Sequence, residues 1–327
     1  MPILGKVGGN GWSARVEQAL AVRDAAMFTR SGYQRPVGKQ TGGEGADRIC
    51  GASGCTSGWR APWKNRRRPI FEQEWGCSPR CLSLLVQAAV RREVGDSIQT
   101  VDVEPHRHRI PLGLVLLAQG WITHPQLQGA LEAQRESGRG RIGDWLTQNC
   151  GLEEERITRG LGVQWNCPVL ALDGFSPTAM ALVMPKRFVA EFGLVPLRVA
   201  GSSLLYLAFQ DRTNAATALG VEQMSGLRVE SGLLHGSAFE SARTRLLAAD
   251  AVPVQMKVAG DRDGLTAGIV KALEQRQPLA TRLVRVHQYY WLRMWLETGA
   301  MSGLGTLPQG PEDMEDYLFM IGPKSGS

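Results

Sequence analysis

Residues 111–134 read PLGLVLLAQGWITHPQLQGALEAQ, and residues 141–164 read RIGDWLTQNCGLEEERITRGLGVQ. The second stretch repeats the pattern of the first at an offset of 30 residues, without a gap. Self-similarity at a fixed period is typical of a repeated supersecondary unit. The matched positions are Leu112 with Ile142, Gly113 with Gly143, Leu116 with Leu146, Ile122 with Leu152, Leu127 with Ile157, Leu131 with Leu161, and Gln134 with Gln164.

Each copy of the repeat is predicted to form two short helices, the first beginning just after the glycine. In the first copy, Thr123 suits the cap of the second helix, because Pro125 and Gln126 follow in its first turn. Glu153 stands at the cap position of the second copy, where it is a weaker cap.

The pattern changes after the repeat, and strands separated by helices predict a small α/β layer. The expected strands are residues 167–172, 194–199, 204–209 and 227–230, with a hairpin formed by the middle two. The expected helices are residues 177–192, 213–224 and 239–249. An aromatic-rich helix is predicted over residues 283–297, followed by a disordered tail in which residues 316–321 form an apolar docking patch.

The predicted fold class is α+β: a tandem helical-pair repeat followed by a small α/β subdomain, with a cysteine-containing N-terminal module and partly disordered termini. The expected parts are a weakly ordered segment at 1–45 with one amphipathic helix at 13–27, a four-cysteine module at 46–95 with a helix at 78–92, a linker at 96–109, the repeat at 110–164, the α/β subdomain at 165–248, and a C-terminal helix with a flexible tail at 249–327.

Composition favours an ordinary folded protein, since 43% of the 327 residues are hydrophobic and 21% are charged. No apolar run reaches the roughly 18 residues that span a bilayer, and the N-terminus has no apolar signal-peptide core, so a cytoplasmic location with reduced cysteines is expected. The net charge of +6 comes from residues 1–109. This basic part is either a solvated tail or a contact for nucleic acid or an anionic membrane surface.

The repeat resembles the tandem motif of the MshE-type N-terminal domain of type II secretion and type IV pilus assembly ATPases. Each copy reads Leu/Ile-Gly-x-x-Leu-x5-Ile/Leu-x4-Leu/Ile-x3-Leu-x2-Gln. The residues FGLVPLRV at 192–199 and LAFQD at 207–211 are also similar to characteristic strands of that domain. The resemblance covers roughly residues 109–248.

The resemblance implies binding of cyclic di-GMP, with one motif holding each guanine half. Glycine and a helix N-terminus suit close approach of a phosphate to backbone N–H groups. The apolar positions would face the flat bases, the glutamines would bind a base edge, and an arginine before the glycine would fork onto guanine. The residues so implied are Arg109, Leu112, Gly113, Leu116, Leu127, Leu131, Gln134, Arg141, Ile142, Gly143, Leu146, Ile157, Leu161 and Gln164. The alternative is that the leucines are only a helical core stripe.

Two features depart from the family pattern. Pro111 stands in the first copy where the second has Arg141, and Arg109 lies two residues upstream. One lost bidentate contact costs about 1–3 kcal/mol, or roughly 10- to 100-fold in affinity. The chain also lacks the phosphate-binding motif G-x-x-x-x-G-K-[ST], so it is not expected to be the ATPase motor itself.

Four of the six cysteines form two pairs, Cys50 with Cys55 and Cys77 with Cys81. Paired cysteines in a reduced compartment favour a metal site, and four thiolates suit a structural Zn²⁺. Unrelated cysteines and a redox pair are the alternatives. Basic residues and tryptophans between the pairs leave nucleic-acid binding as a weaker hypothesis, and it predicts affinity that falls steeply with salt.

The sequence therefore predicts a non-enzymatic cytoplasmic adaptor or signalling protein that binds cyclic di-GMP. The alternative is a ligand-free module that docks to a secretion or pilus machine component through residues 194–209. No histidine or carboxylate spacing indicates a catalytic site.

Overall fold

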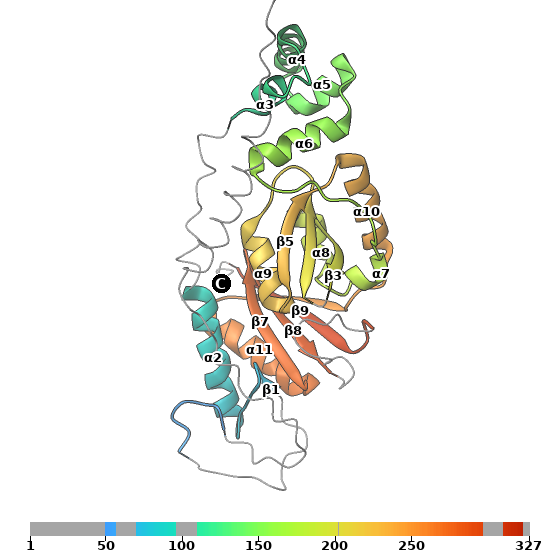
Figure 1. Cartoon of the computed structure of the whole chain (residues 1–327). Helices are drawn as coiled ribbons and strands as arrows, with labels where there is room; N and C mark the ends of the chain where they lie inside the picture. The colour runs from blue at the N-terminus through green and yellow to red at the C-terminus, as the bar shows by residue number, and fades with distance from the viewer. Residues whose placement is uncertain (1–49, 57–69, 96–109, 202, 297–309, 323–327) are drawn as a thin grey trace, which may run out of the picture. The chain divides into compact units, whose positions relative to one another are not determined.

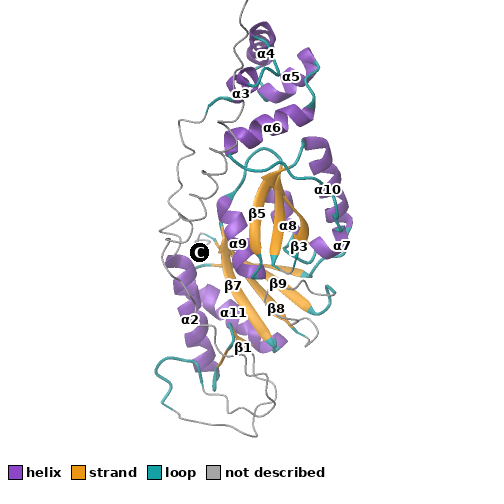
Figure 2. Cartoon of the chain, in the orientation of Figure 1, coloured by secondary structure: helices purple, strands orange, loops and turns teal. Residues whose placement is uncertain are grey.

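The computed structural model describes residues 50–56, 70–95, 110–201, 203–296 and 310–322 (Figure 1). The predicted N-terminal segment and its helix, the linker at 96–109 and Arg109 lie outside these residues. Helices and small sheets alternate along the chain, which confirms the α+β class (Figure 2). None of the helices in the described ranges combines the length and apolarity that crossing a bilayer requires.

The repeat forms four helices as predicted, two in each copy. They are α3 (Leu112–Ala118), α4 (His124–Ser137), α5 (Ile142–Cys150) and α6 (Glu154–Trp165). The cap of α4 is the expected one, because the backbone N–H of Thr123 donates to Gln126 Oε1 at 2.8 Å. Gly138 and Gly151 end α4 and α5 in the left-handed conformation, each with φ of 64°.

The α/β subdomain contains a three-stranded sheet in the order β3-β4-β5. The predicted hairpin is confirmed, since β3 (Leu194–Ala200) and β4 (Leu204–Phe209) pair antiparallel, and β5 (Arg228–Leu233) lies parallel to β4. The remaining elements of this part are α7 (Pro177–Met180), α8 (Lys186–Phe192), α9 (Ala215–Ser225) and α10 (Gly236–Ala248).

Two local predictions in this subdomain are wrong. The strand expected at 167–172 is only an isolated bridge between Val169 and Leu233. The single helix expected at 177–192 is divided into α7 and α8. Pro185 explains the division, because proline disfavours the helical conformation of the residue before it and itself begins a new helix well.

The described residues between 254 and 321 contain a second sheet, in the order β6-β9-β8-β7. Its elements are β6 (Val254–Ala259), α11 (Arg262–Arg276), β7 (Ala280–Val286), β8 (Tyr289–Trp295) and β9 (Met314–Ile321). The helix predicted at 283–297 is therefore wrong, because these residues belong to an antiparallel hairpin of β7 and β8. The expected docking patch at 316–321 is part of β9, which lies between β6 and β8.

Both faces of this second sheet are buried, which explains the wrong prediction. Along β8, Tyr289 and Trp291 belong to the core of the α/β subdomain, whereas Tyr290 and Leu292 belong to a second core with α11. Burial on both faces produces a continuous apolar run without the alternation that marks a half-exposed strand.

The N-terminal described residues pack on the same sheet. The hairpin of β1 (Ile70–Phe71) and β2 (Glu74–Trp75) contacts β7, and α2 (Pro79–Gly95) contacts α11 and β7. The helix expected at 78–92 is thus confirmed. The second core therefore unites residues from the two ends of the described chain, including Phe71, Leu82, Leu265 and Phe319.

A buried ion pair joins β8 to β9 and to the turn between α7 and α8. Arg293 donates from Nε and Nη2 to the two carboxylate oxygens of Asp316, both at 2.8 Å. Its Nη1 donates to the backbone carbonyls of Leu182 and Val183 at 2.9 and 3.1 Å. All charged atoms are partnered, so this pair orients the sheet against the subdomain.

Candidate functional site

The two copies of the repeat are joined by a crossed pair of glutamine hydrogen bonds. Gln134 Nε2 donates to the carbonyl of Gly140 at 2.9 Å, just before α5. Gln164 Nε2 donates to the carbonyl of Ile110 at 2.8 Å, just before α3. Ile110 and Gly140 occupy the same position in the two copies. Each glutamine of one copy thus holds the loop that begins the other copy, which makes the two halves structurally equivalent.

The repeat glycines face the neighbouring helix within their own copy. A Cβ atom on Gly113 would lie 2.6 Å from Leu127 Cδ1, and one on Gly143 would lie 3.0 Å from Ile157 Cγ2. Both glycines are buried. Their missing side chains therefore allow close helix packing, whereas the sequence interpretation assigned them to ligand approach.

The apolar site residues fall into two groups. Leu116 and Leu146 are fully buried and, with Leu127, form the core of the repeat. A flat base cannot contact them without opening that core. The half-buried members, which a ligand could reach, are Leu112, Leu131, Ile142, Ile157 and Leu161.

Arg141 lies at the N-cap of α5 with 66% of its side chain exposed. Its Nη1 forms an ion pair with Asp211, which follows β4 in the α/β subdomain. Its backbone N–H donates to Asp144 Oδ2 at 3.2 Å. Pro111 is the equivalent N-cap residue of α3, so only the second copy offers a guanidinium at this position.

A second polar contact joins the repeat to the subdomain, and the sequence analysis missed it. Glu154 in the first turn of α6 accepts hydrogen bonds from the N–H of Ser237 at 2.9 Å and from its hydroxyl at 2.8 Å. The ring of His235 lies 3.8 Å from the same carboxylate. These partners are far apart in the sequence, and no spacing pattern links them.

The strands proposed as a docking surface are mostly interior. Leu194, Val195 and Leu197 of β3 are buried in the subdomain core, as are Leu207 and Phe209 of β4. The interpretation of residues 194–209 as an exposed docking surface is corrected accordingly. Their apolar character is explained by packing.

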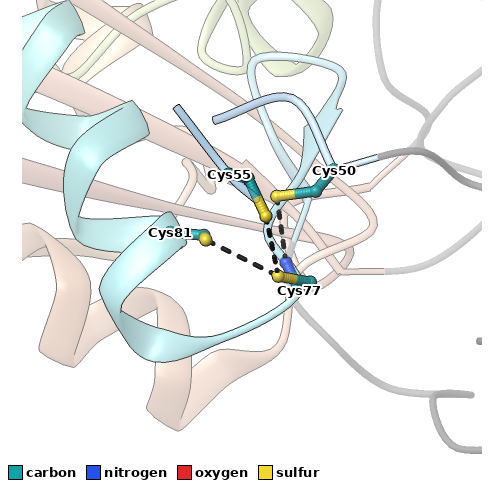
Figure 3. A group of neighbouring side chains, drawn as sticks. All are labelled: Cys50, Cys55, Cys77 and Cys81. Atoms are coloured by element: carbon teal, nitrogen blue, oxygen red, sulfur yellow. Dashed lines mark hydrogen bonds between the residues drawn. The ribbon is translucent and has the colours of Figure 1, made fainter. Parts of the chain in front are cut away.

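The four predicted metal-ligating cysteines come together, although they come from separate segments (Figure 3). Their Sγ atoms all lie within 4.8 Å of one another. None of the four is in a disulfide. The other two cysteines lie elsewhere: Cys150 packs in the repeat and Cys167 against the subdomain core.

The thiol of Cys81 is held in its neutral form by this arrangement. The hydroxyl of Ser78 lowers its pKa, but burial and the three neighbouring cysteine thiols raise it to about 11.

Solved structures similar to this chain belong to the class of domain that the repeat resembles, the MshE-type N-terminal domain of secretion and pilus ATPases. One is a structure of MshE with cdg, 25% identical over 42% of this chain and 99% of its own, with a TM-score of 0.35. Another is the N-terminal domain of XpsE, 19% identical over 41% of this chain and 92% of its own, with a TM-score of 0.29. A second crystal form of that domain is 20% identical over 40% and 90%, with a TM-score of 0.24. No protein-family model and no curated protein matches the chain.

Proposed function

We propose that residues 110–248 are a non-enzymatic sensor domain for cyclic di-GMP, within a cytoplasmic signalling or adaptor protein. The sequence motif that the family uses for this ligand is present in two copies. A solved structure of MshE with cdg is similar to 42% of this chain. We propose that the output passes to a secretion or pilus machine component.

The main support for this proposal is the pair of hydrogen bonds that Gln134 and Gln164 form with the two copies of the repeat. Gln134 and Gln164 place the loops before α5 and α3 in equivalent positions. The first turn of each following helix has N–H groups without intrahelical partners, as at any helix start. A ligand with two equivalent halves matches a pair of equivalent helix starts, because each half can then approach the same backbone groups.

The two halves contribute unequal polar contacts. Arg141 can fork onto a guanine or pair with a phosphate, because its guanidinium is largely exposed at the start of α5. Pro111 offers no such group to the other half. We therefore expect weaker binding than a site with two arginines would show, by roughly 10- to 100-fold.

Isothermal titration of the full-length chain with cyclic di-GMP tests the proposal. We expect one dinucleotide per chain, and GMP binding at least about a hundredfold more weakly because it engages one half only. Absence of heat up to high micromolar dinucleotide would overturn the sensor proposal. A ligand-free interaction module would then remain as the function, and its partner would be captured equally with and without nucleotide.

The variant Arg141→Ala tests the pose. Removing the guanidinium should weaken dinucleotide binding about 10- to 100-fold, because a bidentate contact is worth about 1–3 kcal/mol. Arg159→Ala is the matched control, since Arg159 is exposed and pairs only within α6 with Glu155. Equal affinities of both variants would contradict the assignment of Arg141 to the ligand.

A further inference from the structure

The four-cysteine group is assembled from three pieces of chain around the β1–β2 hairpin. Cys50 and Cys55 precede β1, Cys77 follows β2, and Cys81 lies in the first turn of α2. Cys77 Sγ lies 3.5 Å from Cys55 Sγ and 3.5 Å from Cys81 Sγ (Figure 3). A ligand here is independent of the dinucleotide site, whose residues lie in the repeat.

The sulfur spacing matches a single tetrahedral ion. A Zn–S bond of about 2.3 Å puts the sulfurs of a tetrahedron about 3.8 Å apart. The two Sγ–Sγ distances of 3.5 Å and the upper limit of 4.8 Å for the group bracket that value. A disulfide has about 2.05 Å between its sulfurs, so at 3.5 Å these sulfurs are not bonded to each other. A cluster of two or four irons needs a wider arrangement, because its thiolates are divided between separate iron atoms.

The backbone around the cysteines is shaped to bring them together. The N–H of Cys77 donates to Cys50 Sγ at 3.4 Å, as an outer contact that orients a sulfur ligand does. Gly54 has φ of 85°, which permits the tight turn between Cys50 and Cys55. A side chain on Gly76 would lie 2.9 Å from the backbone nitrogen of Leu82, so glycine lets Cys77 approach α2.

The cysteine site also lies beside the β1–β2 hairpin, a part of the second core that needs further stabilisation. The hairpin turn places Glu72 and Gln73 at φ of 48° and 72°, which is unfavourable for residues other than glycine. Its strands have only two residues each, too few to be stable alone. Ala52, Phe71 and Cys81 nevertheless belong to the core with α11.

We propose that Cys50, Cys55, Cys77 and Cys81 bind one Zn²⁺ as a tetrathiolate site, which fastens the β1–β2 hairpin and α2 to the C-terminal sheet. All four positions around the ion are filled by protein, so the site is structural. Metal binding then supplies folding free energy to the second core.

Metal analysis of the full-length protein, prepared without a metal-affinity tag, tests the site. We expect one zinc per chain, and a cobalt-substituted protein with the visible absorption of tetrahedral thiolate coordination. Cys77→Ser and Cys81→Ser should hold less than about a tenth of the wild-type zinc, whereas Cys150→Ser on α5 should keep it all. A metal-free protein, bound iron, disulfides among the four cysteines, or equal loss in Cys150→Ser would overturn the proposal.

Two measurements on the wild-type chain keep the test decisive if a variant fails to fold. A mercurial thiol reagent should release one zinc for four reactive thiols. Zinc chelation should increase hydrogen exchange in α2, β1 and β2 while leaving α3–α6 unchanged, because those helices have their own core. Unchanged exchange in α2 after complete zinc removal would overturn the structural role. Arg141→Ala should keep its zinc, which separates this result from failure of the sensor proposal.

Discussion

Arg141 belongs to the proposed ligand site and also forms a contact between the repeat and the α/β subdomain. In the structure its guanidinium is paired with Asp211, and 38% of the Asp211 side chain is exposed. An exposed pair of this kind is worth about 0–1 kcal/mol, so a dinucleotide phosphate can displace the carboxylate at small cost. We therefore expect Asp211 to compete with an anionic ligand for Arg141.

We expect Asp211→Asn to increase the affinity for cyclic di-GMP, by no more than about fivefold, because it frees Arg141 and removes a nearby negative charge. Glu155→Gln is the control, since Glu155 pairs with Arg159 on α6. Titration calorimetry compares the two variants at the same salt concentration. A loss of affinity in Asp211→Asn would show that the carboxylate assists binding.

At the scale of elements, strand β7 shows how an edge is protected by side chains. The N–H of Arg285 donates to Glu93 Oε2 at 3.0 Å, and that of Leu283 donates to Glu72 Oε1 at 3.3 Å. Arg92 forms ion pairs with both carboxylates. Burial raises the pKa of Glu93, although Arg92 lowers it. These carboxylates accept hydrogen bonds from backbone N–H groups that would otherwise be available to pair with a strand of another chain.

We expect Glu93→Ala to destabilise the protein by about 1–3 kcal/mol, because the partly buried N–H of Arg285 loses its acceptor. Glu93→Gln should cost less, since the amide oxygen can still accept that hydrogen bond. Glu274→Ala on the exposed side of α11 serves as the control. Denaturant unfolding of the three variants measures the difference. Equal stabilities of Glu93→Ala and the control would contradict this role.

For the whole molecule, the second sheet is shared between two cores. Trp291 is fully buried on the face toward the α/β subdomain, where its ring meets Phe188 edge-on with centroids 5.3 Å apart. Leu292 faces the other core. The subdomain that resembles the secretion-ATPase domain is therefore completed here by C-terminal residues, and ligand titrations require the full chain.

We expect Trp291→Ala to lower the free energy of unfolding by about 3–5 kcal/mol, because it opens a cavity between the subdomain and the sheet. Trp291→Phe should cost much less: it keeps a ring against Phe188 and removes an N–H that has no partner among the described residues. Chemical denaturation followed by circular dichroism provides the comparison. A change below about 1 kcal/mol for Trp291→Ala would show that the two parts are not coupled.

Sequence alone determined the features that depend on local pattern. The gapless repeat predicted two helices in each copy, although α3 and α5 begin at the residue before the glycine rather than after it. Thr123 and Gln126 predicted a cap, and the turn at residues 200–203 predicted the hairpin. These follow from short-range spacing and capping chemistry, which a single sequence displays.

Tertiary structure alone decided the placement of β7–β9, the burial of the repeat glycines, and the pairing of Arg141 with Asp211. The strands carry apolar residues on both faces because each face packs in a different core. Their sequences therefore lack the alternation of apolar and polar residues that marks a strand. The cysteines lie between these cases: their spacing indicated a metal site, but only the fold brings Cys50 and Cys81 together. Contacts between residues distant in the sequence depend on how the whole chain packs, and local propensity does not encode them.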